Sequence, residues 1–212
     1  MEEIKKLTAG FARFRTKYFE KHPELFDQLS RQGQSPNVMV VACCDSRVDP
    51  AIITDSDPGD LFVVRNVANL VPPCEMGGGY HGTSAALEFA VRTLEVKHIV
   101  ILGHSQCGGI QSLLQGIKAP QGDFIIPWMA IAEDARQKIN TTLAHAPSLV
   151  RQRACEQAAI QVSLHNLSTF PWVRERVAQG TLHLHGWYFD IDRGELLHYN
   201  CVTDCFESLE QG

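Results

Sequence analysis

Three short apolar runs constrain the fold of this 212-residue chain more than any other feature of its sequence. They span residues 38–43, 61–64 and 98–102, and each is rich in valine, isoleucine or leucine. A continuous run of this kind, without polar alternation, is typical of a strand buried on both faces of a sheet. A fourth candidate strand spans residues 182–189, and residues 195–200 follow a glycine-containing turn as its hairpin partner.

Helical periodicity fills the intervals between these strands, and the predicted helices span residues 83–94, 109–115, 124–143 and 148–169. Strands that alternate with helices indicate a parallel sheet with right-handed crossovers. We therefore predict an α/β fold: a mostly parallel central sheet flanked by helices, with an antiparallel C-terminal strand. The sequence has no internal repeat and no low-complexity segment, so residues 1–212 are predicted to form a single domain.

An apolar stripe with helical spacing precedes all of the predicted strands. It lies within residues 2–31 and includes Ile4, Leu7, Phe11 and Phe14. Because this stripe precedes every predicted strand of the core, it must pack on a surface formed by later residues, and a partner subunit is one candidate for that surface. We expect an N-terminal helical arm of about residues 2–31.

Composition excludes several classes of protein. The formal net charge is −5, and no run of Lys and Arg resembles a nucleic-acid patch, so nucleic acid is not an expected partner. The apolar runs are too short to span a bilayer and the N-terminus lacks the pattern of a signal peptide, so we expect a cytoplasmic protein without a membrane partner. Seven cysteines without dense pairing favour free thiols plus a metal site.

Two clusters of metal-ligating side chains follow the first and third apolar runs. The first reads Cys43-Cys44-Asp45-Ser46-Arg47, and the second reads His104-Ser105-Gln106-Cys107. In open α/β sheets ligands bind beyond the carboxyl ends of the strands, so both clusters are expected at the same rim. Two thiolates and one imidazole suit zinc and leave the fourth tetrahedral position free for water.

The two adjacent cysteines of the first cluster compete for the role of ligand. If the chain stays extended there, alternate residues face the same side, which groups Cys43 with Asp45 and Arg47 and turns Cys44 away. This alternation favours Cys43 as the ligand, with Cys44 as a small buried apolar residue.

Asp45 has two conceivable roles beside the metal. It could accept a hydrogen bond from a zinc-bound hydroxide, or it could swing in as the fourth ligand and close the site. A bidentate pair with Arg47 would hold the carboxylate off the metal. A plain buried salt bridge is the alternative interpretation of this pair.

The two clusters resemble the C-x-D-S-R and H-x-x-C-G-G motifs of the β-class carbonic anhydrases, which are zinc lyases that interconvert carbon dioxide and bicarbonate. Residues 33–36, 62–69 and 185–187 are also similar to that family. The resemblance covers roughly residues 10–200, and the combined motifs are highly specific to the family.

The resemblance implies a role for each matching residue. The zinc ligands would be Cys43, His104 and Cys107, and the catalytic dyad would be Asp45 and Arg47. The substrate would contact Gln34 from a neighbouring subunit, the Gly108 amide, and an apolar wall of Phe62, Val67 and Phe89. Without the resemblance, core packing would be the preferred interpretation of these last three residues. The family also implies a homodimer or dimer of dimers in which the N-terminal helix packs on a partner subunit.

The predicted function is therefore reversible hydration of carbon dioxide to bicarbonate and a proton by zinc-bound hydroxide. Two alternatives remain open: a carbonyl sulfide or carbon disulfide hydrolase on the same scaffold, and a noncatalytic zinc-stabilised binding protein. The last requires Cys44 or Asp45 to close the metal site permanently.

Two further features concern regulation and a second site. Some members of the family close their site through a bicarbonate pocket built from Trp, Arg and Tyr. Val40 and Phe189 stand at the Trp and Tyr positions here and only Arg65 is kept, so we predict an open site.

His183 and His185 alternate on a predicted strand and share a face. A second metal site is conceivable there, although packing is the favoured interpretation.

Overall fold

The computed structural model describes residues 1–75, 77, 79–116 and 123–209, and the chain divides into two compact units. The first unit, residues 1–35, contains α1 (Glu2–Arg15), the π-helical segment η1 (Thr16–Lys21) and α2 (Pro23–Gln32). The predicted arm is thus helical but interrupted at His22, whose φ of −132° is not helical. Pro23 accounts for this break, because proline disfavours a helical conformation in the residue before it. The single domain and the packing of the arm on a partner stay predictions.

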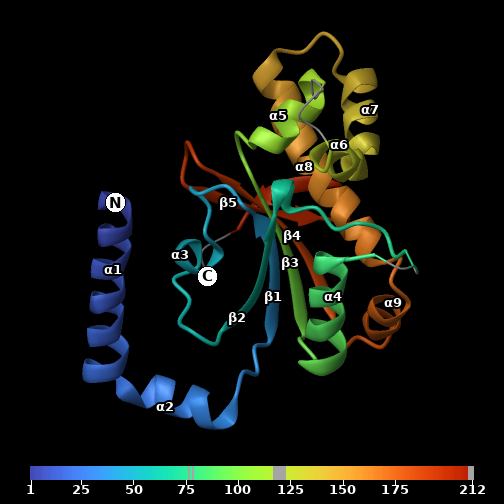
Figure 1. Ribbon diagram of the computed structural model, residues 1–212. Helices are drawn as coiled ribbons and strands as arrows, with labels where there is room; N and C mark the ends of the chain where they lie inside the picture. The colour runs from blue at the N-terminus through green and yellow to red at the C-terminus, as the bar shows by residue number, and fades with distance from the viewer. Residues whose placement is uncertain (76, 78, 117–122, 210–212) are drawn as a thin grey trace. The chain divides into compact units, whose positions relative to one another are not determined.

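The second unit, residues 36–212, is built on a six-stranded sheet of order β2-β1-β3-β4-β5-β6 (Figure 1). The first four strands in this order are parallel, and β5 and β6 are antiparallel to their neighbours. The strands are β1 (Val38–Cys43), β2 (Leu61–Asn66), β3 (His98–His104), β4 (His183–Asp190), β5 (Glu195–Asn200) and β6 (Cys205–Ser208). The predicted α/β fold with a mostly parallel sheet is confirmed.

Helices connect and flank the strands. They are α3 (Pro50–Ile53), α4 (Gly82–Glu88), α5 (Gly108–Gln115), α6 (Ile125–Met129), α7 (Glu133–Thr142), α8 (Ser148–Leu167) and α9 (Pro171–Ala178), with short 3-10 or π segments η2 (Val67–Asn69), η3 (Phe89–Thr93) and η4 (Ala130–Ala132). None of the helices in the described part of the chain has both the length and the apolar character needed to cross a membrane.

The apolar strands are buried on both faces, as their continuous pattern predicts. On one face Met39, Val41, Ile99 and Ile101 pack with core residues from α4, η3, α8 and α9. On the other face Val40, Ala42, Val100 and Leu102 form a separate buried cluster. A third cluster lies around the carboxyl end of β1 and includes Cys43, Cys107 and residues of α5, α7 and α8.

Several element boundaries differ from the sequence-based expectation. β3 continues through His104, which therefore ends the strand instead of following it. The helix expected over 124–143 is three shorter segments, and the second half of the helix expected over 83–94 is π-helical. Helices α3 and α9 and strand β6 were not predicted. The missed elements α3 and β6 are only four residues long, too short for a periodic pattern.

Helix α8 approaches the sheet closely because two strand residues lack side chains. A Cβ atom on Gly103 would lie 2.6 Å from Cδ1 of Ile160, and one on Gly186 would lie 2.9 Å from Cγ2 of the same residue. Ile160 is fully buried, so it has no free space into which to move. The two glycines therefore set the distance between α8 and the central strands.

We expect Gly103→Ala to lower the free energy of unfolding by about 1–3 kcal/mol, because the added methyl group overpacks a filled core. Urea denaturation measures the change. Gly82→Ala is the matched control: a Cβ atom there meets nothing within 4 Å, so its stability should stay within about 0.5 kcal/mol of the parent. Equal stabilities for the two variants would contradict the close approach of α8.

Candidate metal centre

Three metal-ligating side chains meet at the carboxyl edge of the parallel strands. Cys43 ends β1, His104 ends the neighbouring β3, and Cys107 immediately precedes α5. Their ligand atoms all lie within 4.8 Å of one another. The exposed fractions of the three residues are only 5%, 1% and 2%. The two sequence clusters thus form one buried group of two sulfurs and one imidazole.

The ring of His104 is oriented for coordination through Nε2. Its Nδ1 lies 2.8 Å from the carbonyl oxygen of Ser105, and a carbonyl can only accept, so Nδ1 carries the proton and donates it. Nε2 then holds a lone pair, and it is buried with no hydrogen-bond partner in the described part of the chain. A buried, unpaired nitrogen beside two thiols is the arrangement that a metal ion satisfies.

The two thiols favour a bound cation. A hydrogen bond from the Cys107 thiol lowers the pKa of Cys43, and the same interaction raises the pKa of Cys107. The backbone N–H of Asp45 also donates to Cys43 Sγ, at 3.4 Å. These contacts favour the thiolate form of Cys43, which is the form that coordinates metals.

Asp45 is held by Arg47 in a bidentate pair. Nε donates to Oδ1 at 2.9 Å and Nη2 to Oδ2 at 2.7 Å, and the backbone N–H of Arg47 also donates to Oδ1, at 3.0 Å. These bonds hold the pKa of Asp45 well below its usual range, so the carboxylate stays charged. Its Oδ2 lies 4.0 Å from Nε2 of His104, beside the centre but engaged by the guanidinium.

Cys44 does not have the buried position that the alternation of side chains along a strand predicted. The strand ends at Cys43, so the period of two no longer applies beyond that residue. Cys44 is exposed, not buried as predicted, and Asp45 and Arg47 meet across a tight turn instead of along a strand face. The buried group contains Cys43 and not Cys44, although the alternation argument does not apply here, and the role of Cys43 as a ligand stays a prediction.

Arg65 anchors the segment that carries Cys43 and Asp45. Its Nε donates to the carbonyl of Cys43 at 2.9 Å and its Nη2 to the carbonyl of Asp45 at 2.7 Å. Its Nη1 pairs with Asp49 at 2.8 Å, and Asp49 also caps α3. The resemblance associated Arg65 only with a bicarbonate pocket, whereas its contacts here position the ligand segment.

A buried glutamate, Glu156, holds the backbone at Cys107 through a hydrogen bond. Glu156 of α8 accepts hydrogen bonds from the Cys107 backbone N–H at 2.9 Å, from Gln152 at 3.0 Å and from the Tyr188 hydroxyl at 2.8 Å. Burial raises the pKa of this carboxyl group. Sequence reasoning missed Glu156, because residues 151–153 and 157 beside it are charged or amide residues and give no sign that this part of the helix is buried.

Val67 and Gly108 lie near the centre. Gly108 is exposed at the first position of α5, where a Cβ atom would meet nothing within 4 Å. Val67 follows β2 and, with Cys44 and Trp128, lines an apolar cavity of about 800 Å³. The buried group itself does not line this cavity; Cys44, the chain neighbour of Cys43, does.

Three other predicted substrate contacts lie elsewhere. Phe62 and Phe89 pack together, with ring centroids 5.9 Å apart, and Phe62 pairs with Met39 near the start of β1. That register puts the ring pair four residues, or roughly 13 Å, along the strands from Cys43. Gln34 is exposed in the first unit. Their roles in substrate binding stay predictions.

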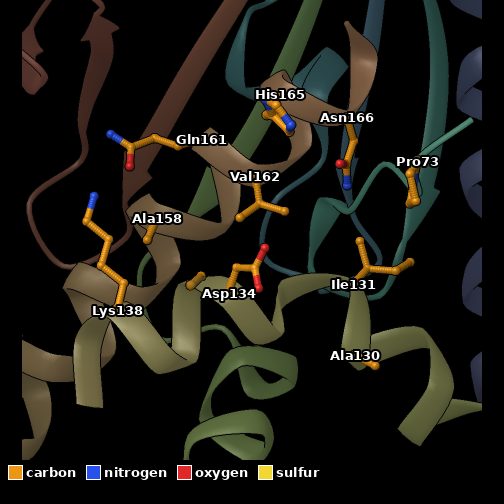
Figure 2. A pocket seen from close by; sticks show the side chains of 11 residues that line it. Pro73, Ala130, Ile131, Asp134, Lys138, Ala158, Gln161, Val162, His165 and Asn166 are labelled. Carbon is orange, nitrogen blue, oxygen red and sulfur yellow. The ribbon is translucent and has the colours of Figure 1, made fainter. Parts of the chain in front are cut away.

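A second hollow lies between α7 and α8 (Figure 2). Asp134 and Lys138 of α7 and His165 of α8 line this groove of about 480 Å³. All three side chains are exposed. The groove contains none of the ligands or their supporting residues.

Comparisons with known proteins place the chain in a family. Residues 38–196 match the family model described as carbonic anhydrase. A carbonic anhydrase of Synechocystis sp. is 37% identical over 206 residues, which cover 96% of this chain and 73% of that protein.

Solved structures agree with this match. The β-carbonic anhydrase CcaA superposes with a TM-score of 0.91 at 36% identity, over 100% of this chain and 94% of that chain. A tetrameric β-carbonic anhydrase of Sordaria macrospora superposes with a TM-score of 0.80 at 30% identity, over 94% of this chain and 96% of that chain.

We expect Glu156→Gln to loosen the third ligand, because an amide cannot accept all three hydrogen bonds that the carboxylate accepts. The free energy of unfolding should fall by about 1–3 kcal/mol, and zinc affinity should fall about 10- to 100-fold. Urea denaturation and competition with a chelator measure the two effects. The exposed Glu175→Gln serves as the control and should match the parent protein in both. Unchanged zinc affinity in Glu156→Gln would rule out this support.

Proposed function

The chain belongs to the β-class carbonic anhydrases, and from that premise we propose that it catalyses the reversible hydration of carbon dioxide to bicarbonate and a proton, with zinc as its metal. The observation that carries the proposal is the buried group of Cys43, His104 and Cys107 beside a carboxylate that Arg47 engages. The described residues add no fourth ligand to this group, and a zinc site with three protein ligands is of the open, catalytic type.

The donor set suits zinc. Two thiolates and one imidazole are ligands that zinc prefers, and the unpaired Nε2 of His104 supplies the nitrogen. Zinc held there would act as a Lewis acid that lowers the pKa of a water molecule toward 7 and so supplies hydroxide as the nucleophile. The remaining steps depend on residues of the chain itself.

Asp45 and Arg47 act together in this proposal. The low pKa of Asp45 keeps it a hydrogen-bond acceptor at every working pH, so it can orient the attacking hydroxyl group toward the substrate. Arg47 prevents the carboxylate from becoming a fourth ligand, since both of its oxygens accept from the guanidinium. The Nη2 of Arg47 also donates to the carbonyl of Gln106 at 3.1 Å, which ties the pair to the loop before Cys107.

The substrate route is the apolar cavity that Val67 lines beside the centre. Carbon dioxide has no net dipole and few polar contacts, so an apolar approach suits it, and the Gly108 amide at the start of α5 is available to an oxygen of bicarbonate. Gln34, Phe62 and Phe89 would complete the pocket from a second copy of the chain. Phe89 is 43% exposed, as a ring that contacts a partner would be in the isolated chain.

We infer that the protein works as a homodimer or a dimer of dimers in the cytoplasm. The Sordaria macrospora structure is described as tetrameric, which supports an oligomer. The apolar face of the N-terminal arm, with Ile4, Leu7 and Phe11 more than 60% exposed, is suited to packing on a partner subunit.

The first test separates the two adjacent cysteines. Cys43→Ser should lose bound zinc and with it carbon dioxide hydration, whereas Cys44→Ser should keep both, because only the first thiol belongs to the buried group. Stopped-flow hydration assays with zinc content measured on the same samples read out the result. Full activity in zinc-free Cys43→Ser protein would refute a metal-dependent reaction.

The second test separates catalysis from metal binding. Asp45→Asn should retain zinc but hydrate carbon dioxide about 10²-fold or more slowly, since an amide cannot accept in the same way as the carboxylate. The same assay between pH 7 and 9 measures it. A zinc-replete parent protein with no activity in this range would favour the noncatalytic binding protein. Faster turnover of carbonyl sulfide or carbon disulfide than of carbon dioxide would favour the hydrolase.

A further inference from the structure

Three histidines gather at the end of the sheet opposite to the metal centre. His98 begins β3 and His183 begins β4, and the two are Cα partners in the parallel pairing of these strands. His185 lies two residues further along β4 and so shares a sheet face with His183. Because β3 runs from His98 to His104, the cluster and the centre are separated by roughly 20 Å of strand.

The three rings are close to one another. Nδ1 of His98 lies 3.1 Å from Nε2 of His185, and the ring centroids of these residues are 5.2 Å apart. The ring of His183 stacks on that of His98, with centroids 5.3 Å apart and planes at 27°. Two backbone bonds fix the strand starts: His98 N–H donates to Asn37 and His183 N–H donates to Lys97. The side chains are thus gathered on a rigid part of the sheet.

The separation of the two closest nitrogens fits a shared metal ion. Two imidazole nitrogens at 2.0–2.1 Å from a tetrahedral ion lie about 3.3 Å apart. A hydrogen bond between the two rings also explains the 3.1 Å distance. In that bond a single proton lies between the two nitrogens, and a metal ion that replaces this proton would bind the lone pairs of both. Burial, together with the charges of His98 and His183, lowers the pKa of His185, which favours the neutral ring that coordinates metals.

The ring of His183 has to rotate before the three histidines can bind one ion. Among the described residues, only Cys43, His104 and Cys107 form a group whose ligand atoms all lie within 4.8 Å of one another, so the three histidines do not yet meet this limit. His183 is exposed, so its ring can rotate toward the other two without disturbing the core. A His-x-His pair on one strand and a histidine on the next then provide three nitrogens from a single sheet face.

We propose that His98, His183 and His185 form a second metal site, distinct from the Cys43 centre, that takes a late first-row divalent ion such as nickel, copper or zinc. The all-imidazole donor set suits these ions and contains no thiolate. An ion there links the beginnings of β3 and β4. The site is independent of the proposed catalysis and would remain if that proposal failed.

Nickel is the probe of choice, because it binds imidazole and does not oxidise thiols. The full chain, loaded with zinc, is dialysed against Ni²⁺, and both metals are quantified by elemental analysis. We expect one nickel per chain with the zinc retained, and a rise in melting temperature. His98→Ala, His185→Ala and the exposed His183→Ala should each weaken nickel binding by about tenfold or more.

The matched control is His145→Ala, which removes an exposed histidine outside the cluster and should bind nickel as the parent does. The surface position of His183 ensures that at least one cluster variant folds, and circular dichroism with zinc content verifies this. The proposal is overturned if the parent takes up no nickel or if His183→Ala and His145→Ala bind it equally. Uptake of nickel with an equal loss of zinc would assign the binding to the Cys43 centre instead.

Discussion

The parallel pairing of β1 with β3 is the interaction on which the rest of the molecule depends. Because parallel neighbours end at the same edge of a sheet, this pairing brings Cys43 and His104 together although they are far apart in the sequence. Both strands are buried on both faces, so their register is held by side chains on two sides. A slip of one residue in either strand would turn the ligand of that strand to the opposite face and separate it from the others.

The pairing brings the ligands together, but separate contacts set their directions. The Ser105 carbonyl orients the imidazole, Arg65 holds the backbone on either side of Cys44, and Glu156 fixes the amide of Cys107. A buried carboxylate is unfavourable unless its oxygens are satisfied, and Glu156 meets this condition with three donors. The site therefore combines a rigid sheet edge with polar groups whose burial is offset by hydrogen bonds.

Local patterns predicted the strands and both ligand clusters because burial on two faces and ligand spacing are properties of short segments. They did not predict the supporting residues. Glu156 lies 49 residues from Cys107, and Arg65 lies 22 residues from Cys43, so these contacts exist only once the topology has formed. The error about Cys44 has a local cause: the strand ends at Cys43, whereas the alternation assumed an extended chain as far as Arg47.

The two ends of β3 show how environment separates two histidines on one strand. His104 is 1% exposed, and its tautomer is set by a carbonyl, so its free nitrogen is committed to the buried group with two thiols. His98 is half-buried, and its nearest polar neighbour is another imidazole. Two thiolates neutralise a divalent ion, whereas imidazoles leave its charge in place, so an ion near His98 should exchange more readily. If both proposed sites bind metal, the same strand would favour tight retention at its His104 end and reversible binding at its His98 end.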